Sequence, residues 1–201
     1  MPFGTLVIYT SSQKGSVEFD KRLFEKFGAR VIRDRAKILL PTPRITKRAI
    51  KILENEAITR VWFGAAAPLA LMASALRKSG ASNIVALSHG HEVWWAKIPI
   101  FKQLLRKIIK DVDYFGYLGN FTKSELLKVS NNPDKLIQIA PGIDTNHFMP
   151  RTASAKLITK YRLEDRRIII CVARLVHRKG QDQLIQAMPK ILESHPDAIL
   201  L

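Results

Sequence analysis

The feature that most limits how this chain can fold is an alternation of short, almost unbroken apolar runs with longer stretches of helical periodicity. The runs include IVAL within residues 83–87 and IIICVA within residues 167–173. Strands buried on both faces of a parallel sheet are apolar at nearly every position, and helices form the crossovers between them. The pattern therefore predicts an α/β chain built from doubly wound, Rossmann-like domains.

The same pattern assigns the individual elements. Strands are expected at residues 6–10, 30–32, 60–63, 83–87, 114–118, 136–139, 167–173 and 198–201. Helices are expected near residues 46–57, 68–77, 101–112, 123–129 and 181–194.

A stretch rich in proline, glycine and polar residues, at residues 141–156, is typical of a linker. We therefore expect an N-terminal domain over residues 1–150 and the beginning of a second domain over residues 151–201. The chain opens directly on a strand and closes on one that would lie within a sheet. The sequence is thus interpreted as a fragment, with the first βα unit of one domain and most of the other missing.

The charge balance is strongly basic, with 33 Lys and Arg against 17 Asp and Glu, a formal net charge of +16. Such a surface favours a polyanionic partner: nucleic acid, an anionic membrane or a phosphorylated small molecule. An ordinary solvated basic surface is the alternative. Nucleic acid is disfavoured, because the basic residues are spread over many elements and not gathered with exposed aromatic side chains.

The chain has one cysteine, Cys171, and no apolar run that could form a signal peptide or cross a bilayer. A disulfide framework is excluded, and a reducing, cytoplasmic compartment is the expectation.

The strongest local motif is ARLVHRKGQDQLIQAM, residues 173–188. A buried strand ends at the start of this motif, and a basic loop with Arg174 and Lys179 follows. Gly180 then allows the turn at which a helix begins. Helix N-termini attract phosphate through unpaired N–H groups and a positive partial charge. The loop therefore suits a diphosphate, although a solvated basic turn would look the same. The Walker pattern for a phosphate loop is absent.

A second motif, LSHGHEVWW, follows another buried strand and carries His89, His91 and Glu92 around Gly90. Residues at the carboxyl end of such a strand face the ligand crevice. Three interpretations remain open: contact with a substrate hydroxyl or phosphate, a metal site, or loop histidines bonded to the nearby backbone. No further His, Asp or Cys cluster completes a metal ligand set, so no metal is expected.

Two further segments have a possible binding role. Gly64 ends a strand and precedes the small residues AAAP, which allow close approach of a ligand or of the next helix. The segment IPIFKQLLRKIIKDV, residues 98–112, has an apolar face and a basic face next to Trp94 and Trp95. It could lie on an anionic bilayer surface, or it could be an ordinary domain helix packed on the sheet.

Four segments together resemble retaining glycosyltransferases of GT-B fold, of the glycosyltransferase family 4 type: WFGAAAPLALM, SHGHEVWW, PGIDTNHF and ARLVHRKGQDQLIQAMP. Within that class they look similar to the GDP-mannose-dependent phosphatidylinositol monomannoside mannosyltransferases. The resemblance implies a GT-B-like fold with an acceptor-side N-terminal domain and a donor-side C-terminal domain.

The resemblance also implies roles for single residues. Arg174 and Lys179 match the basic pair that contacts the donor diphosphate and stabilises the leaving nucleoside diphosphate, with Gly180 beside them. His89 matches the histidine that contacts the transferred sugar. His91, Glu92 and Gly64 are possible substrate-binding neighbours.

The function expected is retaining transfer of a hexose, mannose from GDP-mannose, to a phosphatidylinositol-mannoside-type lipid, as part of phospholipid metabolism and cell envelope biosynthesis. No cofactor is expected, since the nucleotide sugar is a substrate. The expected location is cytoplasmic and peripheral, on the inner face of the plasma membrane. The alternative is a truncated, inactive basic module that binds an anionic membrane surface.

Overall fold

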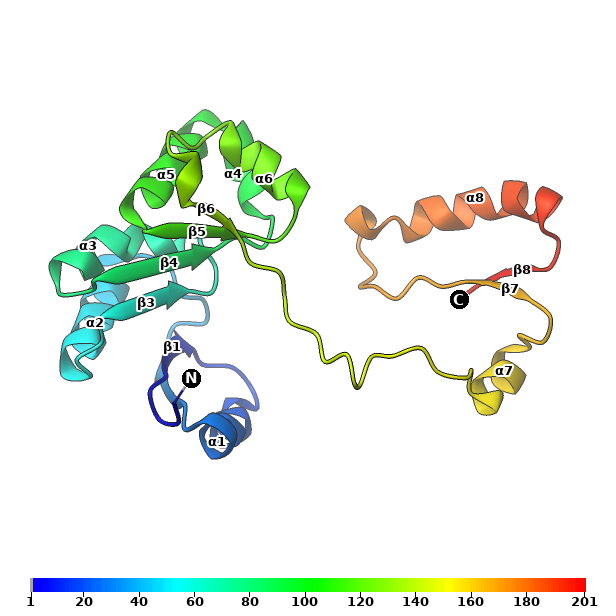
Figure 1. The fold of residues 1–201 in the computed structure, drawn as a ribbon, viewed down its shortest axis with the longest axis horizontal. Helices are drawn as coiled ribbons and strands as arrows, with labels where there is room; N and C mark the ends of the chain where they lie inside the picture. The colour runs from blue at the N-terminus through cyan, green and yellow to red at the C-terminus, as the bar shows by residue number, and fades with distance from the viewer. Residues whose placement is uncertain (1) are drawn as a thin grey trace. The chain divides into compact units, whose positions relative to one another are not determined.

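The structure is a computed structural model that describes residues 2–201. The chain divides into two compact units, the first ending at Gly142 and the second spanning Ile143–Leu201 (Figure 1). Sequence analysis places the boundary at residue 150, within the exposed segment that follows the last strand of the first unit. The division comes earlier because Ile139, whose N–H donates to the carbonyl of Tyr117 at 2.9 Å, is the last residue hydrogen-bonded to the sheet.

The first unit alternates strands with helices. Its strands are β1 (Val7–Ser11), β2 (Arg30–Asp34), β3 (Arg60–Phe63), β4 (Asn83–Leu87), β5 (Tyr114–Tyr117) and β6 (Leu136–Gln138). Its α-helices are α1 (Ser16–Phe27), α2 (Pro43–Asn55), α3 (Ala73–Lys78), α4 (Glu92–Lys97), α5 (Pro99–Asp111) and α6 (Asn120–Leu127), with short 3₁₀ helices η1 (Leu69–Met72) and η2 (Pro133–Lys135).

All strand pairs of this unit are parallel, which confirms the expected α/β, Rossmann-like fold class. A four-stranded sheet has the order β3-β4-β5-β6, and β1 pairs with β2 in a separate two-stranded sheet. The sequence pattern does not reveal this separation, because apolar runs show which segments are strands but not which strands are neighbours.

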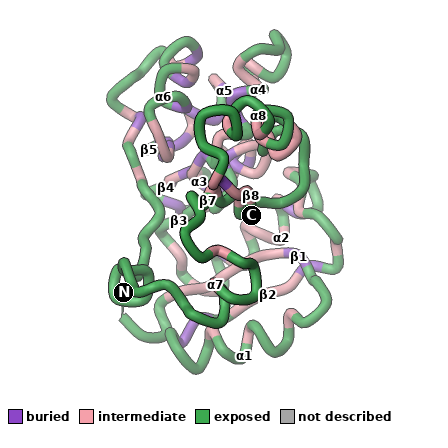
Figure 2. Tube along the Cα trace, turned by 90° about the vertical axis from the view of Figure 1, so that its right-hand side faces the viewer, coloured by how far each residue is buried: buried purple, intermediate pink, exposed green. Residues whose placement is uncertain are grey.

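The core of the unit lies between the four-stranded sheet and the helices that cover it. Ile84 of β4, Phe115 of β5, and Leu105 and Ile108 of α5 are completely buried. Figure 2 draws buried residues of the chain in purple. Burying each such side chain stabilises the fold by about 1.5–3 kcal/mol. Because one face of α5 is buried, this helix packs on the sheet, as the interpretation of residues 98–112 as an ordinary domain helix predicts. Phe101, near its start, is 40% exposed.

The second unit is smaller. It contains α7 (Ala155–Tyr161), β7 (Arg167–Ile169), the 3₁₀ helix η3 (His177–Lys179), α8 (Gln181–Ser194) and β8 (Ala198–Leu200), and β7 pairs with β8 in parallel. Strand β7 is shorter than the expected 167–173, although Cys171 still donates its N–H to the carbonyl of Leu201 at 2.9 Å. Large apolar side chains such as Val172 and Leu175 are exposed, so this unit has little buried core.

None of the helices in residues 2–201 has the length and apolar character needed to span a lipid bilayer.

Candidate functional site

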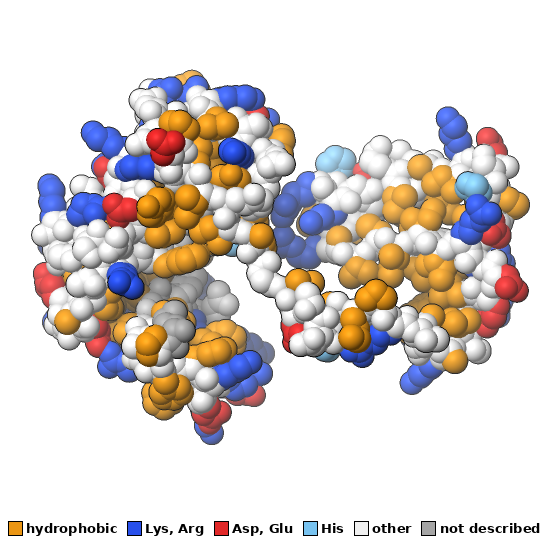
Figure 3. All heavy atoms as spheres, in the orientation of Figure 1, with side chains coloured by type: hydrophobic (Ala, Val, Ile, Leu, Met, Phe, Trp, Pro, Cys, Tyr) orange, Lys and Arg blue, Asp and Glu red, His pale blue; other side chains and the backbone are white. Residues whose placement is uncertain are grey.

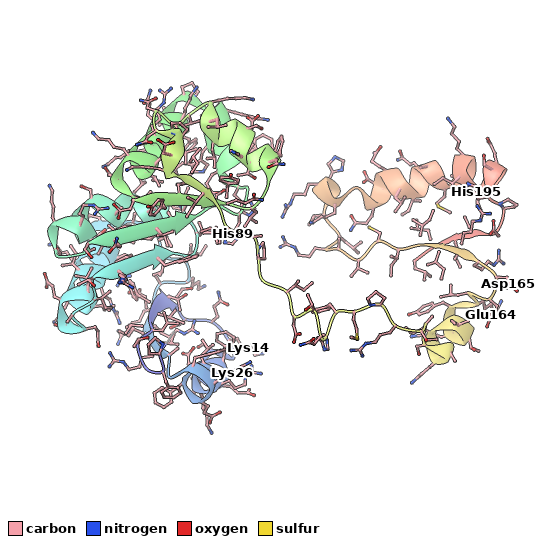
Figure 4. All side chains as sticks on the ribbon, in the orientation of Figure 1. Lys14, Lys26, His89, Glu164, Asp165 and His195 are labelled. Carbon is pink, nitrogen blue, oxygen red and sulfur yellow. The ribbon has the colours of Figure 1, made fainter. Side chains whose placement is uncertain are left out.

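The loop after β4 carries the histidine that sequence analysis selects (Figure 4). Gly90 has a φ of 87°, a conformation that favours glycine, and it turns the chain into α4. The exposed ring of His89 places its Nε2 atom 2.7 Å from the carbonyl oxygen of Gly64, which directly follows β3. A carbonyl oxygen can only accept, so Nε2 is the donor in this contact, and in the tautomer with its single hydrogen on Nε2 the Nδ1 atom keeps a lone pair. The structure thus brings the predicted residues His89 and Gly64 together.

Glu92 lies directly behind this loop and is only 2% exposed. Its Oε2 accepts a hydrogen bond of 2.7 Å from the hydroxyl of Ser88, and its Oε1 accepts one of 3.3 Å from the N–H of Ala67. The hydroxyl of Ser88 in turn accepts from the N–H of Gly90 at 3.1 Å. The carboxylate therefore ties the loop after β3 to the loop after β4, and it is not free to contact solvent.

His91 is exposed and precedes the first residue of α4. Within residues 2–201 no group of three or more His, Cys, Asp or Glu side chains is arranged to hold a metal ion.

The basic loop of the second unit follows β7, and its side chains are open to solvent. Arg174 and Lys179 are both exposed, and Figure 3 shows basic side chains gathered where α8 begins. Gly180 has a φ of 70° and supplies the turn that starts α8, so Arg174, Lys179 and Gly180 border one helix N-terminus. The side-chain amide of Gln181 donates to the carbonyl of Arg174 at 2.9 Å and holds the loop against the helix.

Another exposed surface lies on α4 and the start of α5. Trp94 is 68% exposed and Ile100 is 74% exposed, and Lys97 places its Nζ 5.3 Å from the centre of the Trp94 ring. Trp95, in contrast, packs against Phe101, with ring centres 5.0 Å apart. The surface combines exposed apolar side chains with basic ones.

The first unit also contains a buried charge network that the sequence pattern does not predict. Asp34, at the end of β2, is fully buried and accepts hydrogen bonds from the hydroxyl of Tyr9 at 2.7 Å and from Arg44 at 2.8 Å. Arg48 lies 3.4 Å away. The Arg44 guanidinium, the N–H of Ala36 and the Tyr9 hydroxyl hold the pKa of Asp34 well below its usual range. Burial and the bond to Asp34 raise the pKa of Tyr9 to about 12. The only signal in the sequence is an acidic residue at the end of the short strand RVIRD.

Comparison with known proteins gives these features a context. Residues 154–201 match the family described as glycosyl transferases group 1. The chain is 38% identical over 196 residues to the GDP-mannose-dependent α-(1-6)-phosphatidylinositol monomannoside mannosyltransferase of Mycolicibacterium smegmatis, covering 97% of this chain and 51% of that protein. It is 38% identical over 202 residues to the GDP-mannose-dependent monoacylated α-(1-6)-phosphatidylinositol monomannoside mannosyltransferase of Corynebacterium glutamicum, covering 98% of this chain and 52% of that protein.

Solved structures show the same fold at low sequence identity. The crystal structure of Anabaena Alr3699/HepE in complex with UDP matches all of this chain and 60% of that protein, with a TM-score of 0.67 and 14% identity. The structure of the same protein with UDP and glucose matches with a TM-score of 0.65 and 12% identity, covering 97% of this chain and 60% of that one. This likeness shows a GT-B-like fold.

The chain spans about half the length of the curated relatives it matches. The match at 38% identity extends along almost the whole chain, and the family match covers its last quarter. The chain is therefore similar along almost its whole length to these mannosyltransferases, and its residues 154–201 match the group 1 glycosyl transferases.

Proposed function

We propose that the protein containing these residues transfers mannose from GDP-mannose to a phosphatidylinositol-mannoside-type lipid, with retention of the anomeric configuration. Relatives with 38% identity over nearly the whole chain carry names that specify this donor and this class of acceptor. The observation that carries the proposal is the exposed basic loop of Arg174 and Lys179 at the N-terminus of α8, which is the charge pattern that a sugar diphosphate requires.

In this proposal Arg174, Lys179 and the α8 N-terminus bind the donor diphosphate. The bond between the anomeric carbon of mannose and the diphosphate oxygen breaks, and GDP leaves with the electron pair. Cationic groups placed beforehand around that oxygen stabilise the negative charge as it develops in the transition state. The acceptor hydroxyl forms the new bond, and its proton passes to a phosphate oxygen of the departing GDP. No side chain needs to form a covalent intermediate.

His89 orients the sugar. With Nε2 held by the Gly64 carbonyl, its Nδ1 is available to accept a hydrogen bond from a mannose hydroxyl. Glu92 and Ser88 act indirectly, because their buried hydrogen bonds fix the loop on which His89 stands. Gly64 contributes its carbonyl, and His91 is an exposed neighbour without a defined role.

The surface of α4 and α5 would hold the protein on the anionic inner face of the plasma membrane, where the lipid acceptor lies. Exposed Trp94 and Ile100 suit the boundary between headgroups and acyl chains, and Lys97 and Lys102 suit anionic headgroups. Flotation with anionic and neutral vesicles tests this, with Lys97→Glu/Lys102→Glu compared against the exposed control Lys51→Glu. We expect anionic-selective binding that the double variant weakens, and equal binding to both kinds of vesicle would contradict an electrostatic contribution.

The donor site is tested by Lys179→Ala, with Lys190→Ala on the same helix as the matched control. We expect Lys179→Ala to lower turnover with GDP-mannose by about 100-fold or more, since loss of one such charge-stabilising group typically costs that much. Vesicle binding should not change. Equal turnover of the two variants would mean that the diphosphate binds elsewhere.

A further inference from the structure

Basic side chains also lie at the edge of the first unit's sheet opposite His89. Helix α5 ends at Asp111, shortly before β5, and η2 ends at Lys135, directly before β6. Because β4, β5 and β6 run parallel, both residues lie at the amino ends of the strands (Figure 1). His89 follows the carboxyl end of β4, so it lies at the other edge of the sheet.

A cavity of about 560 Å³ opens between the last turns of α5 and the loop that leads into η2. Its lining includes four cationic side chains and one carboxylate: Arg106, Lys107, Lys110, Lys135 and Asp111. Asp111 forms an ion pair with Lys107. The cavity, which we call the distal basic pocket, therefore has a surplus of three positive charges. A cleft lined by charges of one sign concentrates ions of the opposite sign.

Lys135 removes the main obstacle to an anion at this place. The C-terminal end of a helix carries a partial negative charge, which repels anions. The Nζ of Lys135 donates to the carbonyls of Val112 at 2.6 Å and Lys110 at 2.8 Å, and it lies 3.5 Å from the carbonyl oxygen of Ile109. The carbonyl groups that end α5 are thus bound from within the fold, and the other cations of the pocket are not needed to cap the helix.

Two cations of the pocket remain available to a ligand. Arg106 is half-buried, and its Nε donates to the carbonyl of Val129 at 3.2 Å, which restrains the guanidinium. Within residues 2–201, neither its terminal nitrogens nor the Nζ of Lys110 has a hydrogen-bond or ion-pair partner. A restrained guanidinium with free terminal N–H groups suits bidentate binding of phosphate oxygens.

Neighbouring carboxylates do not cancel this charge. Asp113 accepts hydrogen bonds from Arg77 at 2.9 Å and from the N–H of Ile84 at 2.7 Å, so it is already bound. Asp134 is exposed and does not line the cavity, and solvent and salt screen it. The surplus of positive charge therefore stays within the pocket.

The remaining lining side chains indicate a polar ligand of small size. Gln103, Asn131 and Asn132 carry amide groups that can form hydrogen bonds with hydroxyl groups. Ile109 is the one apolar residue of the lining, and it is only 2% exposed. An acyl chain would find little apolar surface here, and the bases of a nucleic acid would find no aromatic side chain in the lining on which to stack.

We propose that the distal basic pocket binds a soluble small molecule that carries phosphate groups with two or more negative charges together with hydroxyl groups, the chemistry of a sugar phosphate or a nucleotide. Arg106 and Lys110 bind the phosphate oxygens, and Asn131 and Asn132 bind the hydroxyl groups. This site is separate from the basic loop at α8, and it does not depend on the function proposed above.

The first test is a titration of the complete protein that contains these residues with pyrophosphate, at constant ionic strength, followed by NMR of the backbone amides. The amides of residues 106–111 and 131–135 should shift along a saturable curve. Resolution by residue separates this site from the basic loop beside Gly180. Shifts that grow linearly with concentration, or that appear only near Gly180, would refute a phosphate site in the pocket.

Two variants test the assigned residues. Lys110→Gln removes an exposed ammonium without a partner, so it should fold normally, and Arg106→Gln removes the guanidinium. Each should weaken pyrophosphate binding in the pocket by at least about tenfold, the typical effect of one hydrogen bond to a charged group. The matched control, Lys78→Gln at the exposed end of α3, should leave binding unchanged. Equal weakening in Lys78→Gln and Lys110→Gln would mean that only net charge matters, and the pocket would not be the site.

A lipid headgroup is the other source of such phosphate groups, and vesicle flotation distinguishes it from a soluble ligand. With vesicles that contain phosphatidylinositol, Lys110→Gln and Lys78→Gln should float to the same extent, because the pocket is not used at the membrane. Weaker flotation of Lys110→Gln alone would assign the pocket to a lipid headgroup and overturn the proposal of a soluble ligand.

Discussion

Replacing Glu92 with alanine should destabilise the first unit far more than its single charge would suggest. The substitution removes the acceptor for two donors, the Ser88 hydroxyl and the Ala67 N–H. Ser88 is completely buried, so water does not replace the lost acceptor there. Hydrogen bonds to a charged group contribute about 1.5–3 kcal/mol each, and the 3.3 Å bond to Ala67 belongs at the weak end. We therefore expect a loss of about 3 kcal/mol.

Urea unfolding followed by circular dichroism measures this loss. With a slope of about 2 kcal/mol/M, a loss of about 3 kcal/mol lowers the midpoint by about 1.5 M. Glu18→Ala, on the exposed face of α1, is the matched control and should change stability by less than about 0.5 kcal/mol. If the two variants unfold at the same concentration of urea, Glu92 does not join the two loops as described.

A double-mutant cycle with Ser88→Ala isolates the bond between the two side chains. Residues in direct hydrogen-bond contact show coupling energies of about 0.5–3 kcal/mol. If the loss of stability in Ser88→Ala/Glu92→Ala equals the sum of the losses in the two single variants, the hydrogen bond between the two side chains contributes nothing. Glu92 would then stabilise the fold through the Ala67 N–H alone.

Two further predictions concern the histidine and the buried network. His89→Ala should lower mannosyl turnover by about 100-fold with little effect on the free energy of unfolding. The control His147→Ala, at an exposed position, should leave turnover unchanged. If the loss of turnover in His89→Ala comes with a matching loss of stability, His89 has a structural role instead. The pKa of Asp34 is lower in the folded protein than its value of about 4 in the unfolded chain. The ionised carboxylate therefore stabilises the fold fully at pH values above about 4, and this stabilisation is lost as the pH falls through the pKa of the folded state. The difference in stability between the wild type and Asp34→Asn should therefore shrink as pH is lowered below about 4 in acid unfolding, and a constant difference would contradict the charge network.

The strands of the first unit were the most predictable part of the fold. Runs such as Asn83–Leu87 are apolar at nearly every position, and the structure places them in parallel pairs as expected. Helix α5 was also predictable, since Leu105, Ile108 and Val112 recur on one face and are buried there. In these segments the apolar pattern and the buried surface coincide.

Helices α1, α4 and α7 were not predicted, and the reasons differ. α1 (Ser16–Phe27) and α7 (Ala155–Tyr161) carry apolar residues at helical spacing, but they bury no residue in the structure. Charged residues interrupt the apolar positions of α1, and α7 spans only about two turns. α4 (Glu92–Lys97) is a single short helix that begins within the motif selected for its histidines. A segment as short as α4 has too few residues for a local pattern to identify it as a helix, and its buried residues Glu92 and Val93 depend on tertiary contacts.

The candidate site residues were selected by type and position, which shows where a side chain stands but not what it contacts. His89 and Gly64 come together, as neighbouring carboxyl ends of parallel strands must. Glu92 was expected near substrate, yet its carboxylate is used inside the protein. Tyr9, Asp34 and Arg44 are far apart in the sequence, so only the folded chain reveals their network.

The most direct test of the proposed function is a transfer assay with GDP-mannose labelled in the sugar and a phosphatidylinositol monomannoside acceptor, followed by NMR of the product. Supplying UDP-glucose in parallel tests the choice of donor. We predict labelled lipid from GDP-mannose alone, with the mannose α-linked as in the donor, and a loss of product in Lys179→Ala but not in Lys190→Ala. Transfer from UDP-glucose in preference, or a product with inverted configuration, would contradict the account.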